Sequence, residues 1–249
     1  MTGASLVVTD LRVEFSGFVA VGGVSFDAHP GEVRFLIGPN GAGKTTCIDA
    51  VTGLTKATGS ARLGQTELLG KQVHKIVRRG IGRTFQTASV FDELTVLQNL
   101  DIAAGLHRRS VSLLRARRGI DPSIERALEE TGLTGELTTP AGILSYGQKQ
   151  WLEIAMLLVQ DAKVLLLDEP VAGMSQDERT ATGELLQRIA AKRIVLVVEH
   201  DMDFMRRFAT RVTVLHQGKV LSQGTVAEVQ ADPQVQEVYL GTADAITEA

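Results

Sequence analysis

The chain has 249 residues, of which 44% are hydrophobic, so it is long enough to bury a sizeable core as one domain with two subdomains. Its net charge of −3 and its isoelectric point near 6.0 argue against a nucleic-acid binder, which would be basic. We find no signal peptide and no apolar run of about eighteen residues, so we expect a chain that does not itself cross a membrane. The lone Cys47 rules out an internal disulfide and suits a reducing compartment.

The first motif in chain order follows an apolar stretch, RFLIG, which predicts a buried strand at Arg34–Gly38. The run GPNGAGKTT fits the phosphate-loop pattern G-x-x-x-x-G-K-[ST], and a helix-compatible sequence follows it. Glycines let backbone amides face a phosphate, while the Lys44 ammonium suits the β- and γ-phosphates and the Thr45 hydroxyl suits magnesium. The nucleotide-binding residues predicted from this run are Gly38, Pro39, Asn40, Gly41, Ala42, Gly43, Lys44, Thr45 and Thr46.

Two later apolar runs also end in polar residues. The run VLLL is followed by Asp168 and Glu169, and the run IVLVV is followed, after one glutamate, by His200. Such runs suit parallel strands covered on both faces, and ligands bind beyond the carboxyl ends of such strands. If these strands neighbour the one before the phosphate loop, Asp168 would hold magnesium and Glu169 would act as general base or orient water. His200 would sense or stabilise the γ-phosphate, with a structural hydrogen-bonding role as the alternative.

Between these runs, the sequence LSYGQKQWLEIAMLL predicts a capped helix. Ser145 is a good N-cap, and apolar residues recur after it at helical spacing. A hydroxyl and the Gly147 backbone at a helix N-terminus make a second anion site, about a hundred residues after the first. The chain is therefore expected to hold two phosphate-binding devices.

Taken together and in this order, the motifs resemble those of the ATP-binding subunits of ABC transporters. The resemblance covers nearly the whole chain: Walker A is GPNGAGKTT, the Q-loop falls in GIGRTFQ, the signature is LSYGQ, Walker B is VLLLDEP and the switch histidine stands in VEHD. It implies an α/β P-loop NTPase with a RecA-like core sheet and an inserted helical subdomain. Residues 1–86 and 161–249 would form the ATP-binding core, and residues 87–160 the helical subdomain. A helix is also expected around Pro233–Leu240, after a hairpin turn at HQGK.

The same resemblance assigns further site residues. Gln86 would link the γ-phosphate and magnesium to the helical subdomain that touches membrane subunits. Phe15 would stack on adenine, with Phe18 as the second choice and core packing as the alternative for both. The signature would close over ATP held by the P-loop of a second ATPase chain, through Ser145, Gly147 and Gln148.

A closer resemblance is to the ATPases of branched-chain amino-acid transport systems, and within them to the urea-transport branch. It lies in GQKQWLEIAMLL, DEPVAGM and the tail PQVQEVYLG. It implies an ATPase on the cytoplasmic side of the membrane that powers import, most closely of urea, with branched-chain amino acids as the alternative. The implied partners are a related ATPase chain or a second copy, two transmembrane permease subunits and a periplasmic or extracellular solute-binding protein, without nucleic acid. A soluble ABC ATPase acting on ribosomes or DNA, and a regulator without turnover, are the other readings.

Two departures from the family pattern and one basic segment stay open. Tyr146 stands where many relatives have glycine, and Ser175 stands where many place aspartate. The stretch at Leu106–Gly119 carries five arginines and no acid, which indicates a solvated face or contact with lipid headgroups or a membrane subunit.

Overall fold

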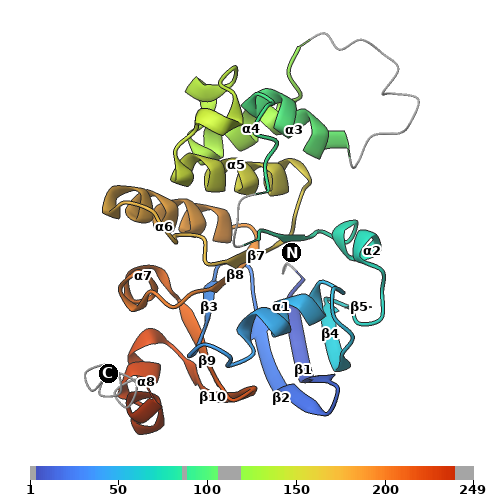
Figure 1. Ribbon diagram of the computed structural model, residues 1–249, viewed down its shortest axis with the longest axis vertical. Helices are drawn as coiled ribbons and strands as arrows, with labels where there is room; N and C mark the ends of the chain where they lie inside the picture. Colours follow the sequence, from blue (N-terminus) through green and yellow to red (C-terminus); the bar gives the residue numbers. More distant parts are fainter. Residues whose placement is uncertain (1–3, 86–88, 106–118, 239–249) are drawn as a thin grey trace.

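A six-stranded, mostly parallel sheet forms the centre of the molecule (Figure 1). The computed structural model describes residues 4–85, 89–105 and 119–238. Within them the strand order is β10-β9-β3-β8-β7-β6, and all neighbours pair in parallel except β9 and β10. The strands are β3 (Val33–Ile37), β6 (Ile81–Arg83), β7 (Val164–Asp168), β8 (Ile194–Val198), β9 (Arg211–His216) and β10 (Lys219–Gly224). The three apolar runs identified in the sequence are thus the adjacent strands β3, β8 and β7.

An antiparallel sheet of four strands lies beside this central sheet, with the order β2-β1-β4-β5. Its strands are β1 (Leu6–Phe15), β2 (Phe18–Ala28), β4 (Thr58–Leu63) and β5 (Thr66–Glu67). In β1, buried and exposed residues alternate over most of the strand, as in a strand with one face toward the core.

Helices α3, α4 and α5 gather at one end of the molecule, and α8 lies toward the other (Figure 1). The helices are α1 (Lys44–Val51), α2 (Val73–Val77), α3 (Val96–Ala104), α4 (Pro122–Thr131), α5 (Tyr146–Val159), α6 (Gln176–Ala190), α7 (Met202–Phe208) and α8 (Val226–Ala231). Two short 3-10 turns, η3 (Thr134–Glu136) and η4 (Ala141–Ile143), join α4 to α5. None of the helices in the described ranges combines the length and apolar character needed to cross a bilayer.

The central sheet is covered on both faces, which explains why its strands are continuous apolar runs. All five residues of β3 are buried. Phe35 belongs to the hydrophobic cluster that includes residues of α3 to α7, whereas Leu36 belongs to the cluster shared with α1 and the antiparallel sheet. Successive side chains of a strand point to opposite faces, so a strand between two layers needs apolar residues at every position.

Two local expectations can be compared directly with the structure. The HQGK turn is the β9–β10 hairpin, in which Gln217 and Gly218 have φ of 48° and 75°, as a type I′ turn requires. Residues 233–238 are helical, in agreement with the expected C-terminal helix as far as the described residues reach. Another helix in the N-terminal part of the chain, α2, was not predicted from the sequence. That helix has five residues and buries only Ile76, so it is too short for helical periodicity to identify it in the sequence.

Candidate active site

The predicted phosphate loop connects β3 to α1 and needs glycine at two of its positions. Gly38 has a φ of 153°, and a Cβ there would lie 2.2 Å from the carbonyl oxygen of Leu215. Gly43, the N-cap of α1, has a φ of 95°, and a Cβ would lie 2.7 Å from the carbonyl oxygen of Ala20. No side chain caps α1, so the amides of its first turn remain available to an anion.

The Lys44 ammonium is held inside this loop. Its Nζ donates hydrogen bonds to the carbonyl oxygens of Gly38, at 2.7 Å, and Pro39, at 3.1 Å. Burial lowers the pKa of Lys44, while the nearby carboxylates of Glu169 and Asp168 oppose that shift. The ammonium is therefore bonded to the loop backbone and is attracted by the two carboxylates at the carboxyl end of β7.

A cavity of about 360 Å³ opens over the loop and unites residues that are distant in the sequence. Its lining residues are Phe15, Phe18, Ala20, Asn40, Gly41, Ala42, Gly43, Lys44, Thr45, Thr46 and Glu169. Phe15 and Phe18 flank the turn between β1 and β2, and 49% and 67% of their surfaces are exposed. Core packing is thus excluded for both rings, and the cavity has two aromatic side chains where the sequence singled out one as first choice.

Asp168 and Glu169 follow each other at the carboxyl end of β7 but differ in environment. Asp168 is buried and receives a 3.2 Å hydrogen bond from Nη2 of Arg83 on its Oδ2. Burial raises the pKa of Asp168, and the Arg83 charge opposes this. Glu169 has a φ of 50°, and its amide donates to the carbonyl oxygen of Val198 at 2.9 Å. This left-handed backbone ends the strand directly after Asp168.

His200 follows β8 and lies next to Glu169, as expected from the strand order. The distance from Nδ1 of His200 to Oε1 of Glu169 is 3.4 Å. The buried Glu199 supports this turn, because its Oε2 accepts the amides of His200, at 2.9 Å, and Asp201, at 3.2 Å. Its Oε1 accepts the amide of Val171 at 3.4 Å, so one carboxylate ties the loops after β7 and β8 together. Burial raises the pKa of Glu199.

The predicted signature helix is α5, and Ser145 caps it as expected. Ser145 accepts the amide of Gln148, and the Gln148 side chain accepts the amide of Ser145, which completes a capping box. The hydroxyl of Ser145 also donates to Oε1 of Glu178 at 2.9 Å, and the amide of Gly147 donates to the same carboxylate. Hydrogen bonds from Ser175, Ser145 and Gly147 lower the pKa of Glu178.

The sequence analysis did not identify three charged residues of the site, Arg83, Glu199 and Glu178. Arg83 joins Asp168 to Asp49 of α1, and nothing in the sequence marks it except its place after an apolar pair in β6. Glu199 stood out only as the neighbour of His200. The pattern from Ser175 to Glu178 is a recognisable capping box, but the reach of the glutamate to the next helix depends on the tertiary fold.

The remaining residues singled out in the sequence are Gln86, the basic segment and Cys47. Gln86 and the arginines of the basic segment lie outside the described residues. Cys47 is buried in α1, and burial raises its pKa to about 12, so this thiol is expected to be unreactive.

The oxygen donors near the loop suit magnesium by their chemistry. Thr45 is exposed in the first turn of α1, and Asp168 ends a strand whose next residue, Glu169, lines the same cavity as Thr45. Mg²⁺ prefers hard oxygen ligands and keeps several waters and phosphate oxygens, so one hydroxyl and one carboxylate are a sufficient protein contribution. No group of three or more histidine, cysteine or acidic side chains among the described residues forms an alternative metal cage.

Comparisons with known proteins agree with this geometry. The family profile described as ABC transporter matches residues 21–172, and that of the branched-chain amino acid ATP-binding cassette transporter matches residues 219–245. The chain is 36% identical over 255 residues to the high-affinity branched-chain amino acid transport ATP-binding protein BraF of Pseudomonas aeruginosa. It has the same identity to LivG of Escherichia coli, a protein described in the same words. Each alignment covers 98% of this chain and 100% of the relative.

A solved structure supports the fold assignment independently. The ADP conformation of MJ1267, an ATP-binding cassette of an ABC transporter, superposes with a TM-score of 0.82 at 30% identity, covering 97% of this chain and 99% of that one. The fold, the order of the motifs and the matched family lead to one conclusion. The chain belongs to the ATP-binding subunits of ABC transporters, with the mixed α/β fold of P-loop NTPases, and it binds and hydrolyses ATP.

Proposed function

We propose that this chain is the ATP-hydrolysing subunit of an importer for branched-chain amino acids. The observation that carries the ATPase part is the adjacency of β3, β8 and β7, which brings Lys44, Glu169 and His200 to one edge of the sheet. The solute rests on relatives alone, because the named relatives BraF and LivG are branched-chain amino acid transport proteins. They give no support to the urea expectation, so branched-chain amino acids replace urea as the first proposal.

The phosphate loop binds the triphosphate in this proposal. The Lys44 ammonium exchanges the carbonyl oxygens of Gly38 and Pro39 for the β- and γ-phosphate oxygens, and the free amides at the start of α1 bind the same anion. Phe15 stacks on adenine, and Phe18 is exposed on the same cavity to assist it. The remaining loop residues supply backbone contacts.

Thr45 and Asp168 hold magnesium, with Gln86 as the proposed third contributor. When bound, this ion neutralises charge that develops on the phosphates. Arg83 keeps the buried Asp168 ionised and oriented, since burial alone would favour its protonated form.

Glu169 is the general base. It takes a proton from a water whose oxygen attacks the γ-phosphorus while the bond from that phosphorus to the bridging oxygen of ADP breaks. His200 lies 3.4 Å from this carboxylate, where it can orient Glu169 and donate a hydrogen bond to the γ-phosphate. The products are ADP and phosphate.

The signature acts on a second ATPase chain. Ser145, Gly147 and Gln148 bind the γ-phosphate of ATP held by the partner's P-loop, because one chain has one P-loop and one signature. The carboxylate of Glu178 has to leave the Ser145 hydroxyl when a phosphate approaches, since like charges repel. A related ATPase is the proposed partner, and a second copy of this chain is the alternative.

The helices α3 to α5 belong to the proposed helical subdomain of residues 87–160, which would face two permease subunits. The chain would then be peripheral on the cytoplasmic side of the membrane, with a solute-binding protein on the other side. These assignments follow from the ABC transporter family and from the transport named for BraF and LivG.

Uptake measurements test the solute. Cells lacking this subunit are supplied with labelled leucine or labelled urea at low concentration, and a copy encoding Glu169→Gln serves as the inactive control. We expect leucine uptake to fall while urea uptake is unchanged. The unaltered gene should restore leucine uptake, and the Glu169→Gln copy should not. The reverse pattern would return urea to first place without changing the ATPase assignment.

A further inference from the structure

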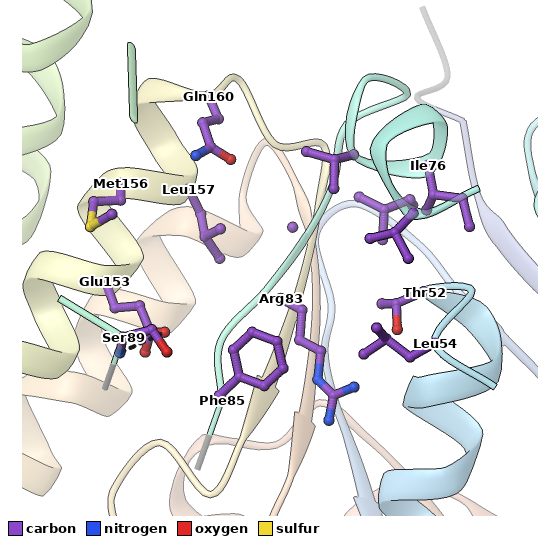
Figure 2. A pocket seen from close by; sticks show the side chains of 14 residues that line it. Thr52, Leu54, Ile76, Arg83, Phe85, Ser89, Glu153, Met156, Leu157 and Gln160 are labelled. Atoms are coloured by element: carbon purple, nitrogen blue, oxygen red, sulfur yellow. Dashed lines mark hydrogen bonds between the residues drawn. The ribbon is translucent and has the colours of Figure 1, made fainter. Parts of the chain in front are cut away.

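An acidic side chain, Glu153, is buried in the middle of the signature helix α5. Only 5% of its surface is exposed, and its Oε2 has no hydrogen-bond partner among the described residues. Glu153 lines a cavity of about 260 Å³ between α5, α2 and β6, and most of the other lining side chains are apolar (Figure 2). A buried carboxylate with an unpartnered oxygen costs stability, so its presence calls for a role other than packing.

The other oxygen of Glu153 is bonded to the chain that follows β6. Its Oε1 accepts the amide of Ser89 at 3.3 Å, and the carboxylate also accepts the amide of Phe85. Figure 2 shows this contact at the end of the cavity where Phe85 and Arg83 lie. The guanidinium of Arg83 lies over the Phe85 ring, 5.1 Å from its centroid. Glu153 therefore attaches α5 to the backbone immediately beyond Arg83.

The two residues before Phe85 hold Asp168 in place. Arg83 donates from Nη2 to Oδ2 of Asp168 at 3.2 Å, and Nη1 of Arg83 also bonds Asp49. The hydroxyl of Thr84 accepts the amide of Asp168 at 3.4 Å. A displacement of the β6 end would move both of these contacts, because Arg83, Thr84 and Phe85 are consecutive.

We infer that Glu153 is a positioning residue for Asp168, acting through the backbone of Phe85 and Ser89 and the side chains of Arg83 and Thr84. This inference rests on the proposed function, in which Asp168 holds magnesium. It connects the helix that begins with the signature to the carboxylate that binds the metal of the same chain. Partners of metal-binding carboxylates affect metal affinity by about 10- to 100-fold, and Glu153 lies one step further away.

The test removes the acceptor while keeping the volume. Glu153→Leu deletes both oxygens and leaves an apolar side chain that suits the cavity, whereas Glu153→Gln keeps an oxygen for the two amides. Leu157→Ala is the matched control, since Leu157 lies one turn along α5 and lines the same cavity but accepts no hydrogen bond. The measurement is binding of a fluorescent ATP analogue by the full chain, titrated with Mg²⁺, with thermal unfolding of each variant alongside.

We expect Glu153→Leu to need about tenfold more Mg²⁺ for half-maximal binding of the analogue, at the low end of the range for supporting residues. Glu153→Gln and Leu157→Ala should stay within about twofold of the unaltered chain, although Leu157→Ala unfolds at a lower temperature. An unchanged Mg²⁺ requirement in Glu153→Leu, or an equal shift in Leu157→Ala, would overturn the inference. Should Glu153→Leu fail to fold, Glu153→Ala is judged by the same criteria.

One further variant separates this inference from the proposed function. Asp168→Asn should raise the Mg²⁺ requirement at least as much as Glu153→Leu. If Asp168→Asn shifts the requirement and Glu153→Leu does not, only the role of Glu153 is wrong. If Asp168→Asn has no effect, the magnesium role of Asp168 fails, and the role of Glu153 fails with it.

Discussion

The hydroxyl of Ser145 donates a 2.9 Å hydrogen bond to Oε1 of Glu178, which places a carboxylate from α6 against the N-terminus of α5. The amide of Gly147 donates to the same carboxylate, and a Cβ at Gly147 would lie 2.7 Å from that oxygen. The other oxygen of Glu178 accepts the hydroxyl of Ser175 at 3.0 Å. The N-termini of α5 and α6 are thus both bonded to the carboxylate of Glu178. In the proposed function, the γ-phosphate of ATP bound by a partner chain occupies this place.

Replacement of Glu178 should strengthen ATP binding by the assembled pair. Glu178→Ala removes a negative charge that opposes the phosphate, so we expect the ATP concentration for half-maximal hydrolysis to fall by about two- to fivefold. Glu184→Ala removes one charge from an exposed position of the same helix and is the matched control. Steady-state hydrolysis against ATP concentration measures the effect, and an increased requirement for ATP would show that Glu178 assists the signature instead.

The signature itself should act only across the subunit interface. Ser145→Arg is expected to leave ATP binding by the isolated chain unchanged, because Ser145 is absent from the cavity over its own P-loop. Hydrolysis by the assembled pair should be strongly impaired. Binding of a fluorescent ATP analogue and phosphate release are compared, and a loss of binding by the isolated chain would refute the action on a partner.

Lys44→Ala should abolish ATP binding by the isolated chain. The substitution removes the cation that the loop carbonyls hold next to Glu169 and Asp168, where the β- and γ-phosphates are proposed to bind. Equilibrium binding of the fluorescent analogue measures this, with Lys56→Ala, an exposed lysine outside the nucleotide cavity, as control. Affinity close to normal in Lys44→Ala would be incompatible with the loop assignment.

Glu153 should make stability depend on pH. Burial raises its pKa from 4.5 to about 7, so the folded chain binds more protons than the unfolded chain between these values. The contribution of Glu153 to the free energy of unfolding is therefore fully present below about pH 4.5 and is lost as the pH rises through 7. The loss is about 3 kcal/mol at most. Arg83 is the other charged residue that lines this cavity.

Glu153→Gln removes this dependence. Relative to the unaltered chain, the variant should gain stability between pH 5 and pH 8, because the amide carries no charge to bury. Denaturant unfolding at both pH values gives the difference, in which contributions from Glu199 and Asp168 are common to both proteins and cancel. A difference that is the same at both pH values would show that Glu153 does not titrate in this range.

The sequence predicted the fold and most positions of the site because each depends on a local pattern. The apolar runs before Gly38, Asp168 and Glu199 identified three strands, and their parallel arrangement followed from their continuous hydrophobicity. Ser145 was recognised as a cap because capping needs only neighbouring residues.

Contacts between distant elements could not be predicted in the same way. Arg83 reaches Asp49 and Asp168 only because β6 pairs with β7 in this sheet. Glu178 reaches Ser145 only because α6 starts beside α5. Glu153 occupies a position that helical spacing assigns to the interior, where a sequence reading expects an apolar side chain. Each of these charged residues has a partner that is distant in the sequence, which a local pattern cannot reveal.

The most direct test of the central claim is phosphate release by the chain carrying Glu169→Gln. The amide keeps the size of the side chain beside His200 but cannot accept the proton of the attacking water. We predict that ATP binding is unchanged and that phosphate release, measured with ATP, Mg²⁺ and the assembled pair, falls by about 10²- to 10⁴-fold. Release at the rate of the unaltered protein, with nucleotide equally bound, would contradict the assignment of Glu169 as the base and the hydrolytic mechanism built on it.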